Sequence, residues 1–406
     1  MRSVLTLNGG SSSIRFALYD AARESTRLLA GKLDRIGLAG TTLTIDDPRK
    51  AAAPAAESAT ATDHGTAAAW LLDRLSGDPL FASVIGVGHR VVHGMQHSQP
   101  ERITPVLLDE LKAITPYDPE HLPREIELIE KITRLQPEWP QVASFDTAFH
   151  RSMPPVATLL PIPRRYFAKG VQRYGFHGLS YTFLMRKLAS LDEGVAARGR
   201  VILAHLGNGA SLAAVQGGHS IDTSMGFTPA SGIMMSTRSG DLDPGIVGFL
   251  ALTESMDARA FEAMVSHESG LLGVSETGSD VRDLLARELQ DPRAAEAVEL
   301  FCYQVRKCIG SFAAALGGLD ALVFAGGIGE NAPQIRARIC APLGFLGIDL
   351  DAVRNARGLD AARGEALIST DAGRVPVRVI RTDEEAVIAA ATVQLLGLTT
   401  NGATHS

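Results

Sequence analysis

The chain has 406 residues, of which 45% are hydrophobic and 21% are charged, and its formal net charge is −6. This length exceeds what one hydrophobic core usually supports, so two domains are expected. The net charge argues against a general nucleic-acid binder, which would need a basic face. No apolar stretch approaches the roughly 18 residues of a membrane span, and the first apolar run is too short for a signal peptide. A cytoplasmic protein is therefore predicted.

The N-terminal half alternates predicted strands and helices. Residues 4–7 and 14–19 are apolar runs on either side of a Gly/Ser turn, which predicts a β-hairpin. The Ala-rich segment 51–61 is expected to be a mobile surface loop. A short buried strand ends in Asp146, and charged groups in that position are often functional in α/β proteins. The other predicted elements are helices at 66–75, 107–114 and 124–132 and strands at 84–92 and 142–145.

The second half repeats the opening pattern roughly 200 residues later, which indicates a duplicated α/β domain. Residues 201–205 and 212–215 predict strands around a Gly/Asn/Ser turn. The proline cluster near residue 150 is the expected domain boundary. Later predicted elements are strands at 321–324 and 375–380, a helix entered near Pro333, a helix at 386–396 and a disordered tail at 399–406.

The two Gly/Ser turns predict phosphate binding. Glycines let the backbone approach an anion closely, and turn N–H groups can point at phosphate oxygens. One turn spans residues 8–13 and is followed by Arg15; the other spans 206–211. Either turn alone also fits an ordinary hairpin. Two of them, one per domain, favour an ATP-dependent phosphotransferase with a cleft between its domains.

A third glycine motif resembles a dinucleotide fingerprint. No P-loop sequence occurs, but residues 327–332 fit the G-x-G-x-x-A pattern between a predicted strand and a predicted helix. Asp349 follows about 20 residues later, as that fingerprint requires. Because the motif comes after both phosphate turns, we interpret its glycines as admitting an adenosine against the backbone.

Histidines and arginines supply further candidates. His89, His93 and His97 would form a metal-binding face on a helix, but their strand-like, glycine-punctuated context argues against that. Arg90 lies in the same apolar segment, where an unpaired charge is costly, so we expect it to meet an anion. Arg238 stands among small hydroxyl residues and suits an anion clamp, although a surface-paired arginine fits equally well.

Together these motifs resemble the acetate kinase family over nearly the whole chain and in the family's order. They lie at residues 8–15, 88–94, 145–150, 173–178, 205–209, 222–229, 237–244 and 324–331. The resemblance implies the actin-like ATPase (ribonuclease H-like) fold of sugar kinases and Hsp70, with two duplicated α/β domains, mixed five-stranded sheets, flanking helices and a cleft between them. Residues 1–150 with 385–406 would form the domain for the acyl substrate and Mg²⁺. Residues 151–384 would form the nucleotide domain, with hinges near residue 150 and Glu384.

The resemblance also implies a reaction and the residues that perform it. The γ-phosphoryl group of ATP would pass directly and reversibly to acetate, giving acetyl phosphate and ADP. Arg90 would bind the substrate carboxylate, with Val92 and Pro229 shaping the pocket for its methyl group. The catalytic positions would be Asp146, His177 and Arg238. Since acetate is already ionised at neutral pH and needs no general base, we expect Asp146 chiefly to organise Mg²⁺ and its waters.

Cofactor positions follow from the same resemblance. Asn8 and Glu384 would hold Mg²⁺, with Mn²⁺ as a plausible substitute. ATP or ADP would contact Arg15, His205, Leu206, Gly207, Asn208, Gly209, Asp280, Val281, Arg282, Gly327, Ile328, Gly329, Glu330 and Asn331. The family is typically homodimeric, so a homodimer is expected, with no nucleic-acid or membrane partner.

Three positions depart from the family's usual residues. Arg15 stands where the family has lysine, and residues 115–119 place Tyr117 in a substrate-pocket segment. Residues 178–181 read Gly-Leu-Ser-Tyr in place of Gly-Thr-Ser-His. Two other functions therefore stay open: a kinase for propionate, butyrate or a sugar, and a non-catalytic ATP-binding switch.

Overall fold

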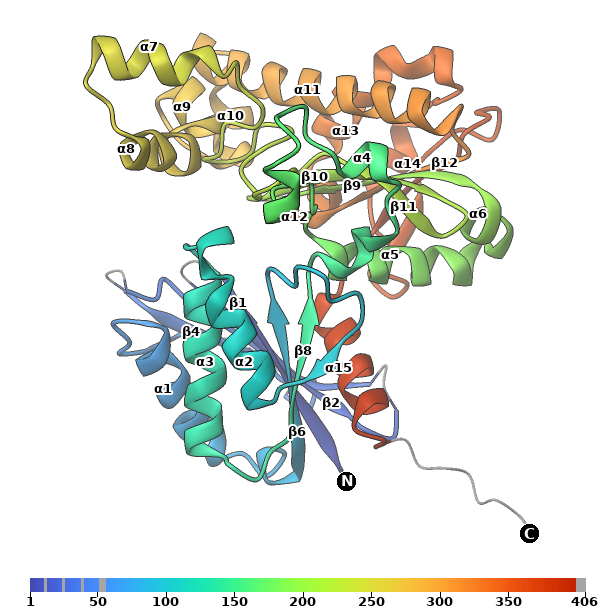
Figure 1. The fold of residues 1–406 in the computed structure, drawn as a ribbon. Coiled ribbons are helices and arrows are strands. Elements are labelled where there is room, and N and C mark those ends of the chain that lie inside the picture. The colour runs from blue at the N-terminus through green and yellow to red at the C-terminus, as the bar shows by residue number, and fades with distance from the viewer. Residues whose placement is uncertain (11–12, 24–25, 38–39, 51–55, 399–406) are drawn as a thin grey trace. The chain divides into compact units, whose positions relative to one another are not determined.

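The computed structural model describes residues 1–10, 13–23, 26–37, 40–50 and 56–398 (Figure 1). By its internal contacts the chain divides into two compact units, Met1–Ala148 with Asp383–Ser406, and Phe149–Thr382. None of the helices in the described ranges combines the length and hydropathy that a membrane span requires.

The first unit is built on a mixed sheet whose described strands run in the order β5-β4-β3-β2-β1-β6-β8-β7. The predicted hairpin is confirmed, since β1 and β2 pair antiparallel from Ser3 opposite Asp20 to Gly9 opposite Ile14. β1, β6 and β8 run parallel to one another. The strands are β1 (Ser3–Gly9), β2 (Ser13–Asp20), β3 (Arg27–Asp34), β4 (Thr42–Asp46), β5 (Ala56–Ser58), β6 (Val84–Val91), β7 (Glu101–Arg102) and β8 (Gln141–Phe145).

Helices cover both faces of this sheet. Alternation along β1 sends Leu5 and Leu7 into a core with α1 and α3, while Val4 packs against α15 with Ala389 and Val393. α15 contacts β1, β6 and β8 on that second face (Figure 1). The helices are α1 (His64–Ser76), α2 (Pro105–Ala113), α3 (Leu122–Leu135) and α15 (Glu384–Leu395).

The prediction of a surface loop at residues 51–61 is wrong for residues 56–58 and 61. Ala56–Ser58 forms β5, which pairs antiparallel with β4, and Ala61 is buried in the core beside α1. The alanine-rich composition favoured a loop, but strand pairing and burial outweigh composition here. Residues 51–55 and the predicted tail at 399–406 lie outside the described residues.

The second unit contains a mixed sheet with the strand order β11-β10-β9-β12-β14-β13. Its strands are β9 (Arg200–Leu206), β10 (Ala210–Gln216), β11 (His219–Thr223), β12 (Ala321–Ala325), β13 (Glu365–Leu367) and β14 (Val377–Ile380). The helices are α4 (Pro155–Thr158), α5 (Gly178–Leu191), α6 (Glu193–Arg198), α7 (Gly245–Thr253), α8 (Ala258–Ala263), α9 (Gly270–Ser275), α10 (Val281–Arg287), α11 (Pro292–Leu316), α12 (Gly326–Asn331), α13 (Pro333–Cys340) and α14 (Ala352–Arg357).

The two sheets share one topology, which confirms the predicted duplication. In the first unit the order β3-β2-β1-β6-β8 has two antiparallel pairings followed by two parallel ones. The order β11-β10-β9-β12-β14 repeats that sequence of pairings. These are the five core strands of the actin-like fold. Both sheets are wider than the expected five strands, because β4, β5 and β7 extend the first and β13 extends the second.

The helix predicted near Pro333 is confirmed as α13, and the late glycine motif before it forms a further short helix, α12, that the sequence did not predict. β12 ends at Ala325, and α12 begins at Gly326, whose φ of 76° lies in the left-handed region. A Cβ at Gly326 would lie 2.6 Å from the Leu206 carbonyl oxygen, so only glycine lets the chain turn this closely against the end of β9. α12 therefore starts directly at the strand end.

Candidate active site

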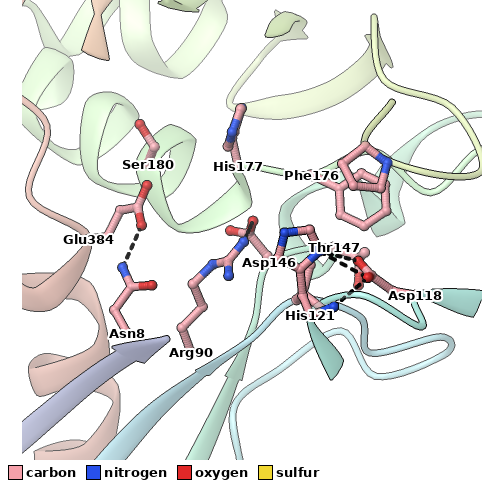
Figure 2. Close-up of polar contacts among 12 residues, drawn as sticks. Asn8, Arg90, Asp118, His121, Asp146, Thr147, Phe176, His177, Ser180 and Glu384 are labelled. Atoms are coloured by element: carbon pink, nitrogen blue, oxygen red, sulfur yellow. Dashed lines mark hydrogen bonds and ion pairs between the residues drawn. The ribbon is translucent and has the colours of Figure 1, made fainter. Parts of the chain in front are cut away.

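Polar residues of the first unit converge where its parallel strands end. Asn8 lies near the end of β1, Arg90 near the end of β6, and Asp146 follows β8 (Figure 2). Because β1, β6 and β8 are parallel, their carboxyl ends meet at one edge of the sheet. The first turn of α15 brings Glu384 to the same edge. The structure thus brings together four of the residues predicted from the sequence.

Arg90 is held by two buried carboxylates. Its Nη1 donates to Glu125 Oε1 at 3.0 Å and its Nη2 donates to Asp146 Oδ2 at 2.9 Å. The side chains of Arg90, Glu125 and Asp146 are 14%, 3% and 1% exposed. The second oxygen of Glu125 accepts from the Val92 N–H at 2.8 Å. Two residues predicted to bind the acyl substrate, Arg90 and Val92, are therefore linked through Glu125.

Burial and charge act against each other in this group. Burial disfavours the charged form of Arg90, but Asp146 and Glu125 outweigh it and raise the pKa of the guanidinium. Burial raises the pKa of Glu125 to about 8, although Arg90 and the Val92 N–H favour the ionised form. Arg90 thus stays a cation, whereas Glu125 changes its charge near neutral pH.

Asn8 and Glu384 form an adjacent polar pair. Asn8 Nδ2 donates to Glu384 Oε2 at 2.9 Å (Figure 2). It also donates to Glu385 Oε1 at 3.4 Å. Burial and the charge of Asp146 raise the pKa of Glu384 to about 7. Carboxylate and amide oxygens are the ligands that Mg²⁺ prefers, and a divalent cation would stabilise the ionised form of this buried carboxylate. The donor set therefore fits the predicted metal.

Arg15 lies beside this pair on β2, opposite Asn8 in the hairpin register. Its exposed side chain lines a hollow of about 250 Å³ together with Lys32 and Glu385. A phosphate role for Arg15 stays a prediction, and Ser11 and Ser12 of the same turn lie outside the described residues.

The segment 115–119, which contains Tyr117, lies at the same edge of the first unit's sheet, where the parallel strands end. The Tyr117 ring lies 5.7 Å from the ring of His93, measured between centroids. The neighbouring Asp118 is buried and accepts from the His121 N–H at 2.9 Å, while its Oδ1 lies 3.0 Å from His121 Nδ1 (Figure 2). This segment is thus fixed by a buried polar pair.

In the second unit, His177 stands at the head of a hydroxyl chain. It precedes α5 in a left-handed conformation, with a φ of 59°. His177 Nδ1 lies 2.8 Å from Ser211 Oγ, and that oxygen lies 2.5 Å from the hydroxyl of the fully buried Tyr181. The His177 ring also stacks on His205, with 4.4 Å between centroids. These contacts fix the plane of the imidazole and link its Nδ1 to hydroxyl groups.

Gly209 lies close to both His177 and Arg238. A Cβ built on Gly209 would lie 3.2 Å from His177 Nε2 and 3.7 Å from Arg238 Nη1. The same Arg238 nitrogen donates to the Pro229 carbonyl at 3.3 Å. The second phosphate turn, the predicted catalytic residues His177 and Arg238, and Pro229 therefore form one group.

The predicted adenosine segment adjoins the second phosphate turn. A Cβ on Gly207 would lie 3.8 Å from the Gly327 nitrogen. Glu330 fixes this region by accepting from the backbone N–H groups of Gly326 and Thr382, at 3.0 and 3.1 Å. The remaining predicted residues of these segments lie on β9 and its turn or on α12: His205, Leu206, Asn208, Ile328, Gly329 and Asn331.

Asp280, Val281 and Arg282 lie at the start of α10. Asp280 caps this helix and pairs with Arg282 at 2.6 Å, and the Arg282 side chain is 87% exposed. Their role at the nucleotide stays a prediction.

Sequence reasoning missed Glu125, which completes the group around Arg90. Glu125 interrupts the apolar stripe that Leu122 and Ile126 give to α3, and this interruption was the available signal. Ser211 belonged to the predicted phosphate turn and Tyr181 to a segment that departs from the family, but their contacts were not predicted, because the partners lie far apart along the chain. Arg336 was missed as well; it is fully buried and donates to the carbonyls of Gly329 and Glu330 in α12.

Comparison with known proteins finds acetate and propionate kinases that match nearly the whole chain. Residues 3–390 match the model of the acetokinase family. An acetate kinase of Rhodopseudomonas palustris is 43% identical over 403 residues, covering 95% of this chain and 96% of its own. A propionate kinase of Citrobacter rodentium is 41% identical over 392 residues, with 95% of each chain covered. The crystal structure of Porphyromonas gingivalis acetate kinase is similar, with a TM-score of 0.87, 35% identity, and coverage of 98% of this chain and 100% of that one.

Proposed function

The chain belongs to the acetokinase family, and from this premise we propose that it transfers the γ-phosphoryl group of ATP to acetate. The products are acetyl phosphate and ADP, and the reaction is reversible. The observation that carries this proposal is the position of Arg90, a cation with a 14% exposed side chain beside Asp146 at the ends of the parallel strands. A non-catalytic ATP switch has no need of a carboxylate clamp.

The first unit prepares the acyl anion. Arg90 binds the acetate carboxylate and offsets part of the repulsion between that anion and the phosphates. Acetate is ionised at neutral pH, so no residue has to remove a proton from it. Asp146 holds Arg90 in place through its hydrogen bond at 2.9 Å, and we assign its other oxygen to ordering waters around the metal.

Asn8 and Glu384 are the residues that would hold Mg²⁺. When bound, the metal supplies positive charge that offsets the phosphate oxygens. Mn²⁺ has the same preference for oxygen ligands and would serve as a substitute.

The second unit supplies hydrogen-bond donors to the phosphoryl group. If Ser211 donates to His177 Nδ1, the neutral imidazole keeps its proton on Nε2, the nitrogen beside Gly209. Arg238 adds a fixed cation next to that nitrogen. Preorganised donors of this kind stabilise charge that develops during transfer, and removing one typically costs roughly 10²–10³ in kcat.

Acetate and propionate are the two acyl acceptors to compare. The acetate kinase of R. palustris and the propionate kinase of C. rodentium differ by only two points of identity to this chain, 43% and 41%. We propose acetate as the preferred acid, with Val92 and Pro229 limiting the acyl chain. Butyrate is then expected to be the poorest of the three acids.

A homodimer is part of the proposal, supported by α7. This nine-residue helix consists of apolar residues and glycines up to Thr253, and none of its side chains is buried within the chain. Phe249 is 63% and Leu252 is 89% exposed. A patch of this kind is typical of a protein–protein interface. Size-exclusion chromatography with light scattering would measure the oligomeric state, and a cytoplasmic location stays a prediction.

A hydroxamate assay with a panel of acids tests the proposed reaction. Acyl phosphates react with hydroxylamine to give coloured hydroxamates, so formation of product is read directly. The proposal expects ATP- and Mg²⁺-dependent product with acetate, less with propionate and least with butyrate. ATP binding without any hydroxamate would instead support the non-catalytic switch.

A further inference from the structure

Glu125 is a buried carboxylate of the first unit to which the proposed reaction assigns no role. Its carboxylate is 3% exposed and is held by two donors, Arg90 Nη1 at 3.0 Å and the Val92 N–H at 2.8 Å. Both donors belong to residues assigned to the acyl substrate. Arg90, the cation that has to bind the acid, is therefore already hydrogen-bonded to two carboxylates of the protein itself, those of Asp146 and Glu125.

The two terminal nitrogens of Arg90 are already engaged. Nη1 faces Glu125 and also donates to the Gly9 carbonyl at 3.4 Å, while Nη2 faces Asp146 at 2.9 Å. An arginine binds a carboxylate best with two parallel N–H groups. An incoming acid must therefore share a nitrogen with one of these internal carboxylates or displace it.

The charge balance around Arg90 opposes a further anion. One guanidinium faces Glu125 and Asp146, and the charge of Glu384 also acts on it. With all three carboxylates ionised, acetate would join a group that already carries excess negative charge. Neutralising one internal carboxylate at hydrogen-bond distance from Arg90 should strengthen acid binding markedly.

Glu125 is a carboxylate at hydrogen-bond distance from Arg90 that can lose its charge. The groups that face it are Arg90 and the Val92 N–H from β6, Asp118 from the segment before α3, and Asp146 after β8. Burial, together with Asp118 and Asp146, raises its pKa to about 8, against the effect of Arg90 and Val92. Glu125 is thus largely neutral below this pH and ionised above it.

We propose that Glu125 is an internal competitor for Arg90, whose charge sets the affinity of the acyl half-site for its carboxylate substrate. This inference rests on the proposed function, since it concerns the acid that Arg90 receives. In its ionised form Glu125 weakens acid binding. In its neutral form it leaves the charge of Arg90 to the substrate and still occupies the space beside Val92. Binding of the acid is therefore favoured where Glu125 carries a proton.

The test is the KM for acetate of the wild type and of Glu125→Gln, measured at saturating Mg²⁺ and ATP near pH 6.5 and near pH 9. Because acetate is ionised at both values, its own charge does not change. At the higher pH the KM of Glu125→Gln should be about tenfold below that of the wild type, and at the lower pH the two should agree within about twofold. The kcat and the KM for ATP should change by less than about twofold.

Glu127→Gln is the matched control. Glu127 lies on the same helix, and its carboxylate lies beside Gly65 of α1. This variant removes one negative charge two residues away without touching Arg90. Its KM for acetate should follow the wild type at both pH values.

Three outcomes would overturn the inference. In the first, the KM of Glu125→Gln equals or exceeds that of the wild type near pH 9. In the second, the two enzymes differ by the same factor at both pH values, which a purely structural role predicts. In the third, the KM of the wild type stays flat across this range; this outcome decides the question even if the variant fails to fold. A wild type that forms no acyl phosphate would contradict the proposed function itself.

Discussion

The two units repeat one sheet topology but place different chemistry at the strand ends. In the first unit, Arg90, Glu125 and Asp146 form a group of one cation and two buried carboxyl groups. In the corresponding region of the second unit, His177, Ser211 and Tyr181 form a chain of an imidazole and two hydroxyls. The first arrangement suits fixing an anion beside a cation, and the second suits donating hydrogen bonds in a set direction. Duplication thus conserved the strand order, while the side chains at the strand ends diverged.

This difference predicts different sensitivities to substitution. Removing one partner from a buried charged group leaves another charge buried without compensation, which affects folding and function together. Removing one hydroxyl from a hydrogen-bonded chain costs little stability and changes mainly the orientation of the group at its end. The predictions below separate these two behaviours.

The largest effect is expected from Arg90→Ala. The variant removes the acid-binding cation and leaves Glu125 and Asp146 facing each other in a buried environment. We expect acetyl phosphate formation to fall by at least about 10³-fold and the free energy of unfolding to drop by about 3–5 kcal/mol. The hydroxamate assay and urea unfolding measure the two effects. Arg90→Lys, which keeps the charge, should retain more stability than Arg90→Ala; equal stability of the two variants would contradict the account.

The next largest effect is expected when a glycine is replaced by alanine in each of the two hairpin turns. In Gly209→Ala the new methyl group would lie 3.2 Å from His177 Nε2 and would displace the imidazole. A shift of about 1 Å at a reacting group costs about 100-fold in kcat. In Gly9→Ala the methyl group would meet Glu125 Cγ at 3.7 Å, an ordinary contact, so activity should change by less than about threefold. The kcat values of both variants are the measurement, and similar losses would remove the distinction between the turns.

A smaller effect is expected along the hydroxyl chain. Ser211→Ala removes the partner of His177 Nδ1 and should lower kcat by about tenfold, with the KM values nearly unchanged. Tyr181→Phe acts one step further away and should lower kcat by only about threefold. If the hydroxyls act through His177 as one chain, the double variant should be no slower than Ser211→Ala alone. Fully additive losses would show that Tyr181 does not act through Ser211.

The smallest effect concerns the start of α15. The Tyr19 hydroxyl donates to Asp383, at 3.0 and 3.2 Å to its two oxygens, and Asp383 caps this helix by accepting from the Ala386 N–H. Tyr19→Phe should therefore lower the free energy of unfolding by about 1 kcal/mol. Its kcat should stay within about twofold of the wild type, because Asp383 keeps its capping bond. A large fall in the kcat of Tyr19→Phe, with its stability in urea nearly unchanged, would show that this hydroxyl does more than support the helix.

The sequence predicted those features that depend on local pattern. The β1–β2 and β9–β10 hairpins follow from apolar runs around small-residue turns, and the position of Asp146 follows from a buried strand that ends in a charge. The position of Glu125 at Arg90 could not be read in the same way, because the partners are separated by 35 residues. The link from Tyr181 to Ser211 likewise depends on how α5 packs against β10. Long-range partners need the fold before they can be assigned.

The measurement that tests the central claim most directly is phosphorus NMR of the wild type with ATP, Mg²⁺ and acetate. If the charged group of the first unit fixes the acid and the donors of the second unit stabilise the transferred group, acetyl phosphate and ADP should appear in equal amounts. Omission of acetate should then stop nearly all ADP formation. ADP accompanied by inorganic phosphate, with no acetyl phosphate signal and no dependence on acetate, would contradict the account.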